Sequence, residues 1–473
     1  VAQVEALADE TRGLSAEVAL WQERAAAEEG EKERLQAHLD ELGEGGKQAA
    51  GNLVDASQPR VPPLSVQVEE AVASALSSGQ GGRVWEDSGR GGSRTGGLVE
   101  ALCKTQLMAS SLRSLATEVQ GTMGTRSRSD ELPESPLQMV DEKRFMHVLS
   151  GEDERDGGAL LYHKMPEVFD ITEGTKHYPS SMHYLMPIRK MPGVHVDIEK
   201  PFWWDTPLWI ASGMVDSIGL LNSHMQRNKM LSNEAWGKER DVKRFPGVHG
   251  NGQWSQEIYY RILNTGHRIA PSAGSASGVL DNPVGYNRVY VFCGEEFSWD
   301  TWWENLKQGK VVVTNGPLMR PLVNGKVPGH VFTAEQGESL TLQATLSLAV
   351  QDKVEYLEIV RDGLVIENIP LDEYAKMGGR LPEVEFKQSG WMLIRAVTSN
   401  SKTYRLASSG PFYVEIGGSR RISKAATQFF IDWLKERQEL VQLDDPQQRE
   451  DVLRYYIAAE KYWEAVLQAS NVD

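Results

Sequence analysis

Several residue types and patterns are scarce in this chain, and each scarcity excludes a class of protein. Only two of the 473 residues are cysteines, Cys103 and Cys293, so a disulfide framework is not expected. No apolar run approaches the ~18 residues that a membrane span needs, so we expect a soluble protein without a transmembrane segment. Lys and Arg number 50 against 66 Asp and Glu. The net charge of −16 argues against general nucleic-acid binding, which requires a basic face.

Two further signals are missing. The chain begins at Val1 and not at Met, so we expect a processed or incomplete N-terminus, and the sequence indicates no compartment. None of the ten histidines belongs to a His-x-His pair or a His-Glu-x-x-His motif. The strong local signals for zinc are therefore absent.

The informative residues are concentrated between Pro271 and Pro328. Segments rich in Ser, Gly, Asn and Pro, which supply turns, alternate there with short Val-rich strands such as Arg288–Phe292 and Val311–Thr314. Small polar residues therefore fall at the predicted strand ends: Ser275, Ser277, Asn287 and Asn315. In α/β proteins ligands bind at this rim, so these four are candidate substrate-binding residues.

The same block carries a resemblance to a known family in four segments: Gly274–Gly278, Pro283–Val291, Trp299–Gly309 and Thr314–Pro317. Their order resembles that of the Gly-Ser-Asp-x-His, Pro-x-Gly-x-x-Arg-x-Tyr-Val, Trp-containing helix and Thr-Asn-Gly-Pro segments of the carbaryl-hydrolase-like (CehA/McbA) metallohydrolases. That group belongs to the polymerase-and-histidinol-phosphatase (PHP) superfamily. The match covers about Met146–Glu415. It implies a distorted α/β barrel in which divalent ions activate water against an ester, carbamate or phosphoester.

The chain departs from that family at the metal motif. Ala276 and Gly278 stand where Asp and His are expected, and neither side chain can hold a metal. The resemblance therefore implies the fold, while the metal site is either altered or absent.

The expected fold class is α/β, in five parts. They are an amphipathic, coiled-coil-like helix (1–42), linkers with short helices (43–140), a PHP-like α/β domain (141–316), an immunoglobulin-like β-sandwich (317–418) and C-terminal helices (419–473). Alternating strands and a hairpin turn at Asp362-Gly363 predict the sandwich. Two helices are expected in the α/β domain, one over Gly250–Arg268 ended by Gly266 and one over Ser298–Gln308. The aromatic C-terminal helices are expected to pack on the preceding domains or on a partner.

Scattered residues remain as metal candidates. On a predicted strand, His195, Asp197 and Glu199 occupy alternate positions and therefore share a face. Together with Asp205 and His224, His195 and Glu199 form the candidate metal set, which suits Zn²⁺ or Mn²⁺. His224, at the end of a hydrophobic strand, is also the catalytic candidate. Two alternatives stay open: a solvent-facing strand edge, and a histidine bonded to a nearby backbone carbonyl.

Four further residues are candidates for binding a substrate. Trp203 and Trp204 either wall a pocket or belong to the core. Asn222 ends a hydrophobic strand. Arg288 either pairs with an internal carboxylate or faces an anionic ligand.

Two functions follow from these patterns. The first is a degenerate PHP-type protein, a pseudoenzyme, that acts as a structural or interaction subunit with protein partners on its N- and C-terminal helices. The alternative is a metal-dependent hydrolase of esters, carbamates or phosphoesters with an altered site. The first fits the missing metal motifs and the added helices. Peripheral membrane association is compatible with either.

Overall fold

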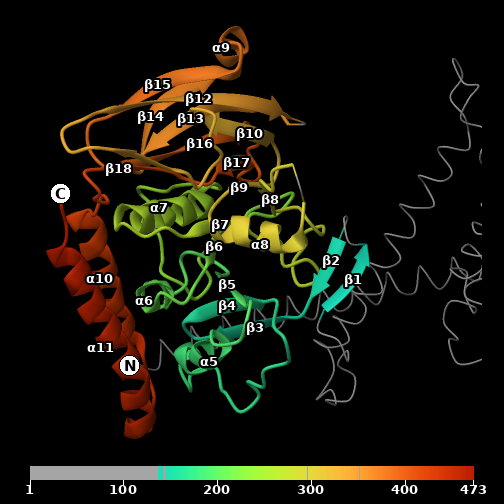
Figure 1. The fold of residues 1–473 in the computed structure, drawn as a ribbon. Coiled ribbons are helices and arrows are strands. Elements are labelled where there is room, and N and C mark those ends of the chain that lie inside the picture. The colour runs from blue at the N-terminus through green and yellow to red at the C-terminus, as the bar shows by residue number, and fades with distance from the viewer. Residues whose placement is uncertain (1–136, 142–144, 296, 351) are drawn as a thin grey trace, which may run out of the picture. The chain divides into compact units, whose positions relative to one another are not determined.

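The computed structural model describes residues 137–141, 145–295, 297–350 and 352–473 (Figure 1). The helix expected over 1–42 and most of the linkers expected over 43–140 lie outside these residues; the last four linker residues begin a strand instead. The described part opens with an antiparallel hairpin of β1 (Leu137–Asp141) and β2 (Phe145–Val148). None of the helices in the described ranges is long and apolar enough to cross a membrane.

A mixed sheet, here called sheet A, forms the centre of the α/β part. Its strands are β3 (Ser150–Arg155), β4 (Gly158–His163), β5 (His195–Ile198), β6 (Ser217–Leu221) and β7 (Ala270–Ala273), in that order. The β3–β4 and β4–β5 pairs are antiparallel, whereas β5, β6 and β7 run parallel. Every residue of β6 is buried, as the apolar run of a central parallel strand predicts. Helices α5 (Ser181–Ile188) and α6 (Thr206–Ser212) lie between its strands in sequence.

Two sheets build the second part of the chain. Sheet B contains β8 (Arg288–Val291), β9 (Val311–Thr314), β11 (Val331–Ala334), β13 (Val354–Arg361), β14 (Leu364–Pro370), β16 (Gly390–Thr398), β17 (Leu406–Ser409) and β18 (Phe412–Ile416). Sheet C contains β10 (Leu318–Val323), β12 (Leu340–Ala349) and β15 (Arg380–Phe386). Helix α9 (Leu371–Lys376) follows β14. Buried residues of both sheets form one hydrophobic cluster between them.

Helix α7 (Gly250–Asn264) lies on the other face of sheet B, between that sheet and sheet A (Figure 1). Alternate residues of β16 therefore pack in two directions. Leu393 belongs to the cluster that includes α7 and sheet A, whereas Ile394 belongs to the cluster between sheets B and C. This double coverage explains why all nine residues of β16 are buried.

The predicted local features are present. The hairpin of β13 and β14 turns at Asp362 and Gly363, whose φ angles of +50° and +88° suit a primed turn. Helix α7 ends just before Gly266, at φ +81°. Ser298 caps helix α8 (Trp299–Lys307) by accepting a hydrogen bond from the backbone N–H of Thr301.

The boundary predicted at residue 316 cuts through a sheet. Strands β8 and β9 pair with each other, and β9 pairs with β17 rather than with β7. The side chain of Asn315 fixes this connection, because it accepts from the backbone N–H of Leu406 and donates to the carbonyl of Tyr404. Within the described ranges, sheet A is therefore open at β7, and its strands close no barrel.

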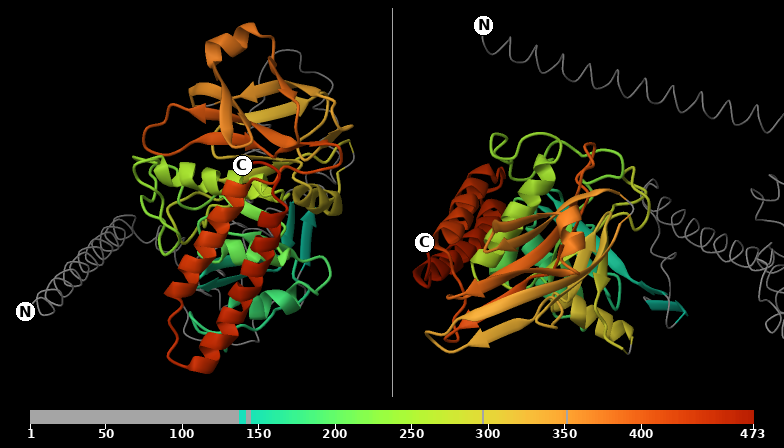
Figure 2. Two further views of the ribbon diagram at one scale, coloured as in Figure 1. Left: turned by 90° about the vertical axis from the view of Figure 1, so that its left-hand side faces the viewer. Right: turned by 90° about the horizontal axis from the view of Figure 1, so that it is seen from above.

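The C-terminal helices α10 (Lys424–Leu440) and α11 (Pro446–Gln468) lie side by side against the α/β part (Figure 2). Their aromatic stripe is buried, with Phe430, Trp433 and Trp463 fully covered. The indole N–H of Trp463 donates to the carbonyl of Pro207, the second residue of α6. Of the two packing alternatives, packing on the preceding domain is the one observed for this stripe.

Candidate functional site

The polar face of sheet A holds the best candidate site. His195 and Asp197 point to the same side of β5, because both reach the hydroxyl of Ser217 on the neighbouring strand β6. Each is only 5% exposed. The solvent-facing alternative is therefore wrong, since β5 is flanked by strands on both sides.

Asp197 is the centre of a buried hydrogen-bond network. The hydroxyls of Ser217 on β6 and Ser272 on β7 both donate to its Oδ2 atom. Burial raises the pKa of Asp197 to about 6, against the lowering effect of these two bonds. Burial lowers the pKa of His195 to about 3, so its ring is neutral near pH 7. Because Ser217 already donates to Asp197, His195 Nε2–H donates to the Ser217 oxygen over 2.7 Å.

This network limits the chemistry available to the carboxylate. One oxygen of Asp197 is occupied by two hydroxyl donors, and a metal at that oxygen would have to displace them. Ser217 is fully buried, so its hydroxyl is inaccessible to a substrate. The arrangement stabilises a carboxylate inside a parallel sheet and presents no exposed nucleophile.

A cavity of about 510 Å³ lies at the amino end of β5, with His195 in its wall. The His195 ring is 5.3 Å from Trp303 of α8 and 6.4 Å from His163 of β4, centroid to centroid. Burial lowers the pKa of His163 to about 4. Lining cations are already paired, since Arg189 donates two hydrogen bonds of 2.7 and 2.9 Å to Asp216.

The carboxyl end of β5 carries a second group of polar side chains. Glu199 accepts from the ammonium of Lys200 at 2.5 Å and from the indole N–H of Trp203 at 3.3 Å. Partial desolvation at the sheet surface, followed by the nearby charge of Glu199, raises the pKa of Glu152 on β3, although its side chain is exposed. Lys200 also lies 4.5 Å from the ring centroid of Trp203. A cation already lies among these carboxylates.

His224 is bonded to a backbone carbonyl, which is one of the two alternatives the sequence left open. Its Nδ1–H donates to the carbonyl of Asn233 over 3.0 Å, since a carbonyl can only accept. Its ring packs 5.1 Å from that of Phe202, and the residue is 4% exposed. Burial, and then the charge of Lys200, lower its pKa to about 3. The imidazole is therefore a neutral group in a packed environment.

The Asp205 carboxylate binds side chains of the C-terminal helices. Its Oδ1 atom accepts from Tyr456 Oη at 2.6 Å and from Arg437 Nε at 3.1 Å. It is 4% exposed. Residues of α10 and α11, which follow Asp205 by more than 230 residues in the sequence, thus donate the hydrogen bonds to this carboxylate.

The structure does not bring the candidate metal set together. His195 lies at the amino end of β5 and Glu199 beyond its carboxyl end, while Asp205 faces α10 and α11. His224 and Glu199 both lie near Lys200. Across the described ranges, no group of three or more His, Cys, Asp or Glu side chains has an arrangement that could hold a metal ion. The expectation of one shared site over these four residues is therefore corrected.

The candidate tryptophans belong to the packed interior or its margin. Trp203 is 1% exposed, and a Cβ added at Gly158 would lie 2.3 Å from its ring, so it fills the core. Trp204 is half-buried and packs against the same core cluster, with Lys238 5.6 Å from its ring centroid.

Three of the candidate rim residues do meet. The Ser275 hydroxyl accepts from the backbone N–H of Asn287 at 2.8 Å, and Asn287 Nδ2 donates to the carbonyl of Asn222 at 3.0 Å. Thr314 is opposite Arg288 in the antiparallel β8–β9 pair. Asn315, which follows Thr314, therefore lies at the same end of this pair as Asn287, which precedes Arg288. All four side chains are buried. They hold neighbouring loops together instead of lining an open pocket.

Two rim candidates lie elsewhere. Ser277 is half-buried and forms an isolated bridge with Leu280. Arg288 donates to the carbonyls of Gly285 and Tyr286 and to Tyr290 Oη, and no carboxylate of the described part of the chain pairs with it. A half-buried guanidinium can remain solvated and needs no buried partner.

Sequence reasoning missed several members of these networks. Ser217 and Ser272 occupy short apolar strands, and only the register of β5, β6 and β7 places them beside Asp197. Asn282 was also not among the predicted site residues, although its side-chain amide donates to the backbone carbonyls of Ser275 and Ser223. An Asn between Asp281 and a proline was a usable turn signal.

Comparison with known proteins adds no relative to this picture: no family model, no curated protein and no solved structure matches the chain.

Proposed function

We propose that this chain is a PHP-like protein that has lost metal-dependent hydrolysis and acts as a structural or interaction subunit. In this proposal sheet A corresponds to an opened PHP-type barrel, and sheets B and C to an immunoglobulin-like sandwich. The supporting observation is that the groups suited to metal binding are bonded within the protein. Asp197 binds two serine hydroxyls, Asp205 binds Arg437, and His224 binds a carbonyl.

The rim of the strands supports the same proposal. A hydrolase needs an open pocket at the carboxyl ends of its parallel strands. Here Asn222, Ser275 and Asn287 are at most 8% exposed and are bonded to one another and to loop carbonyls. Space that a substrate would need is occupied by amide side chains.

The alternative is a hydrolase with an altered zinc or manganese site. Its only support is that Glu152, Glu199 and His224 all lie near Lys200, and these three are not arranged to hold a metal ion. The Lys200 ammonium opposes it, since its positive charge raises the free energy of a divalent ion placed beside it. On balance the charges favour the non-catalytic proposal.

A turnover assay separates the two. The full chain is incubated with zinc or manganese and tested on a panel of esters, carbamates and phosphoesters. We expect no metal-dependent turnover above buffer, and no difference between wild type and His224→Ala. Turnover that requires metal and disappears in His224→Ala would overturn the proposal, provided that Arg320→Gln, at an exposed and distant position, keeps it.

A further inference from the structure

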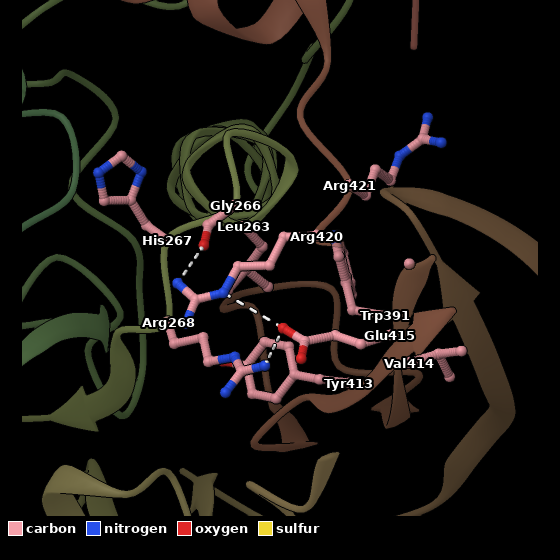
Figure 3. Close-up of a pocket in the computed structure, with 11 residues that line it drawn as sticks. Leu263, Gly266, His267, Arg268, Trp391, Tyr413, Val414, Glu415, Arg420 and Arg421 are labelled. Atoms are coloured by element: carbon pink, nitrogen blue, oxygen red, sulfur yellow. Dashed lines mark hydrogen bonds and ion pairs between the residues drawn. The ribbon is translucent and has the colours of Figure 1, made fainter. Parts of the chain in front are cut away.

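Two arginines converge on one carboxylate where α7 ends beside sheet B. Arg268 follows α7, Arg420 precedes α10, and both donate to the same oxygen, Oε1 of Glu415 on β18 (Figure 3). The Arg268 guanidinium also lies 5.0 Å from the ring centroid of Tyr413, which fixes its position. Two positive charges are thus held against one negative charge. Arg420 Nη1 also donates to the carbonyl of Gly266 at 3.3 Å, whereas Arg268 Nε and Nη1 have no acceptor among the described residues.

These arginines border a groove on the surface. A small cavity of about 20 Å³, drawn in Figure 3, shares Gly266, His267, Arg268 and Arg420 with a groove of about 620 Å³. The remaining wall of the groove is mostly apolar, and it consists of Thr265, Ile422, Tyr462, Ala465, Val466 and Ala469. The groove is therefore cationic at one side and aliphatic at the other.

The groove is preorganised and its histidine adds no charge. His267 bonds Thr265 Oγ1 on one ring nitrogen and Tyr462 Oη on the other, both at 2.7 Å. Burial lowers its pKa to about 4. Ala465 on α11 and Ala469, the C-cap of that helix, are exposed and lie one helical turn apart, so a partner backbone can approach closely. Among the described residues that line the groove, Arg268 and Arg420 carry the positive charge.

We propose that this groove binds an acidic, aliphatic peptide segment of a partner protein. A carboxylate of the peptide engages Arg268 and Arg420, and an adjacent aliphatic side chain lies on Ala465 and Val466. Planar guanidinium groups recognise carboxylates through paired hydrogen bonds, which gives the site its selectivity. A nucleic acid fits less well, because two arginines form no broad basic face and the chain carries a net charge of −16. The inference rests on the proposed interaction role and names the chemistry of its partner.

Fluorescence anisotropy on the full chain tests this site. The probe is a fluorescein-labelled peptide of about twelve residues that alternates Glu and Leu, with a Lys-for-Glu peptide as its counterpart. We expect saturable binding of the Glu peptide only, weakened at least ~10-fold in the double variant Arg268→Gln/Arg420→Gln. Ala465→Glu should weaken binding too, because it adds a like charge to the groove and leaves both arginines in place.

The matched control is Arg320→Gln, which removes an exposed arginine on β10, outside the groove. It should bind the Glu peptide as wild type does. Absence of saturable binding up to about 1 mM, equal weakening by Arg320→Gln, or tighter binding of a single-stranded oligonucleotide would each overturn the proposal. A melting curve on every variant separates loss of binding from loss of folding. Failure here leaves the turnover assay unaffected, so the two proposals fail separately.

Discussion

Removing Asp205 tests how the C-terminal helices are held to the α/β part. Its Oδ1 atom accepts from Arg437 at 3.1 Å and from Tyr456 at 2.6 Å, and both Asp205 and Arg437 are at most 5% exposed. Asp205→Ala leaves a buried guanidinium whose remaining carboxylate partner is Asp156, at 3.2 Å. Breaking a buried pair costs roughly 3–5 kcal/mol, and the surviving partner places the expected loss near 3 kcal/mol.

Urea unfolding of the full chain, followed by tryptophan fluorescence, measures this loss. With an m-value of about 3 kcal/mol/M, the midpoint should fall by about 1 M. The matched control is Glu385→Ala, which breaks an exposed pair with Lys387 and should cost under ~1 kcal/mol. The double variant Asp205→Ala/Arg437→Met should lose less than the sum of the single changes, because no unpaired charge stays buried. A midpoint that moves no more than in the control would refute this account of the interface.

Three further changes have calculable outcomes. Gly158→Ala should destabilise by at least ~2 kcal/mol in the same urea assay, because φ is +116° and the new Cβ would lie 2.3 Å from the Trp203 ring. Trp463→Ala should cost about 3–5 kcal/mol as a core truncation; a loss below 1 kcal/mol would show that it is not core. Burial lowers the pKa of His195 and His224 to about 3, so between pH ~6.5 and ~4 the unfolded chain binds protons that the folded chain does not. These two histidines should therefore lower the free energy of unfolding as pH drops through that window, against the opposite contribution of Asp197, whose pKa is raised to about 6. His195→Gln should reduce the histidine slope by up to ~1.4 kcal/mol per pH unit; an unchanged slope would contradict its burial as a neutral ring.

Local signals in the sequence predicted local structure well. The Asp362-Gly363 turn was predictable because both residues tolerate positive φ, and the end of α7 because Gly266 follows it. Alternation correctly placed His195 and Asp197 on one face. Part of the rim was also predictable, since Ser275, Asn287 and Asn315 flank predicted strands and were expected at one end, whereas Ser277 lies elsewhere.

Partners distant in sequence were not predictable. Nothing near Asp205 indicates that Arg437 and Tyr456 bind it, because that contact depends on how α10 and α11 dock. The pairing of β9 with β17, which places strands from both sides of residue 316 in one sheet, likewise depends on tertiary packing. Hydrophobic pattern fixes which face of a strand is buried, but it does not name the neighbouring strand.

Metal stoichiometry tests the central claim most directly. The full chain is incubated with zinc, desalted and analysed for metal content. Because Asp197, Asp205 and His224 are bonded within the protein, we expect well below one equivalent, with no change in Asp197→Asn or His224→Ala. About one equivalent or more of zinc bound to the wild type, lost in His224→Ala but kept in Arg320→Gln, would contradict the account and favour a metal-dependent enzyme.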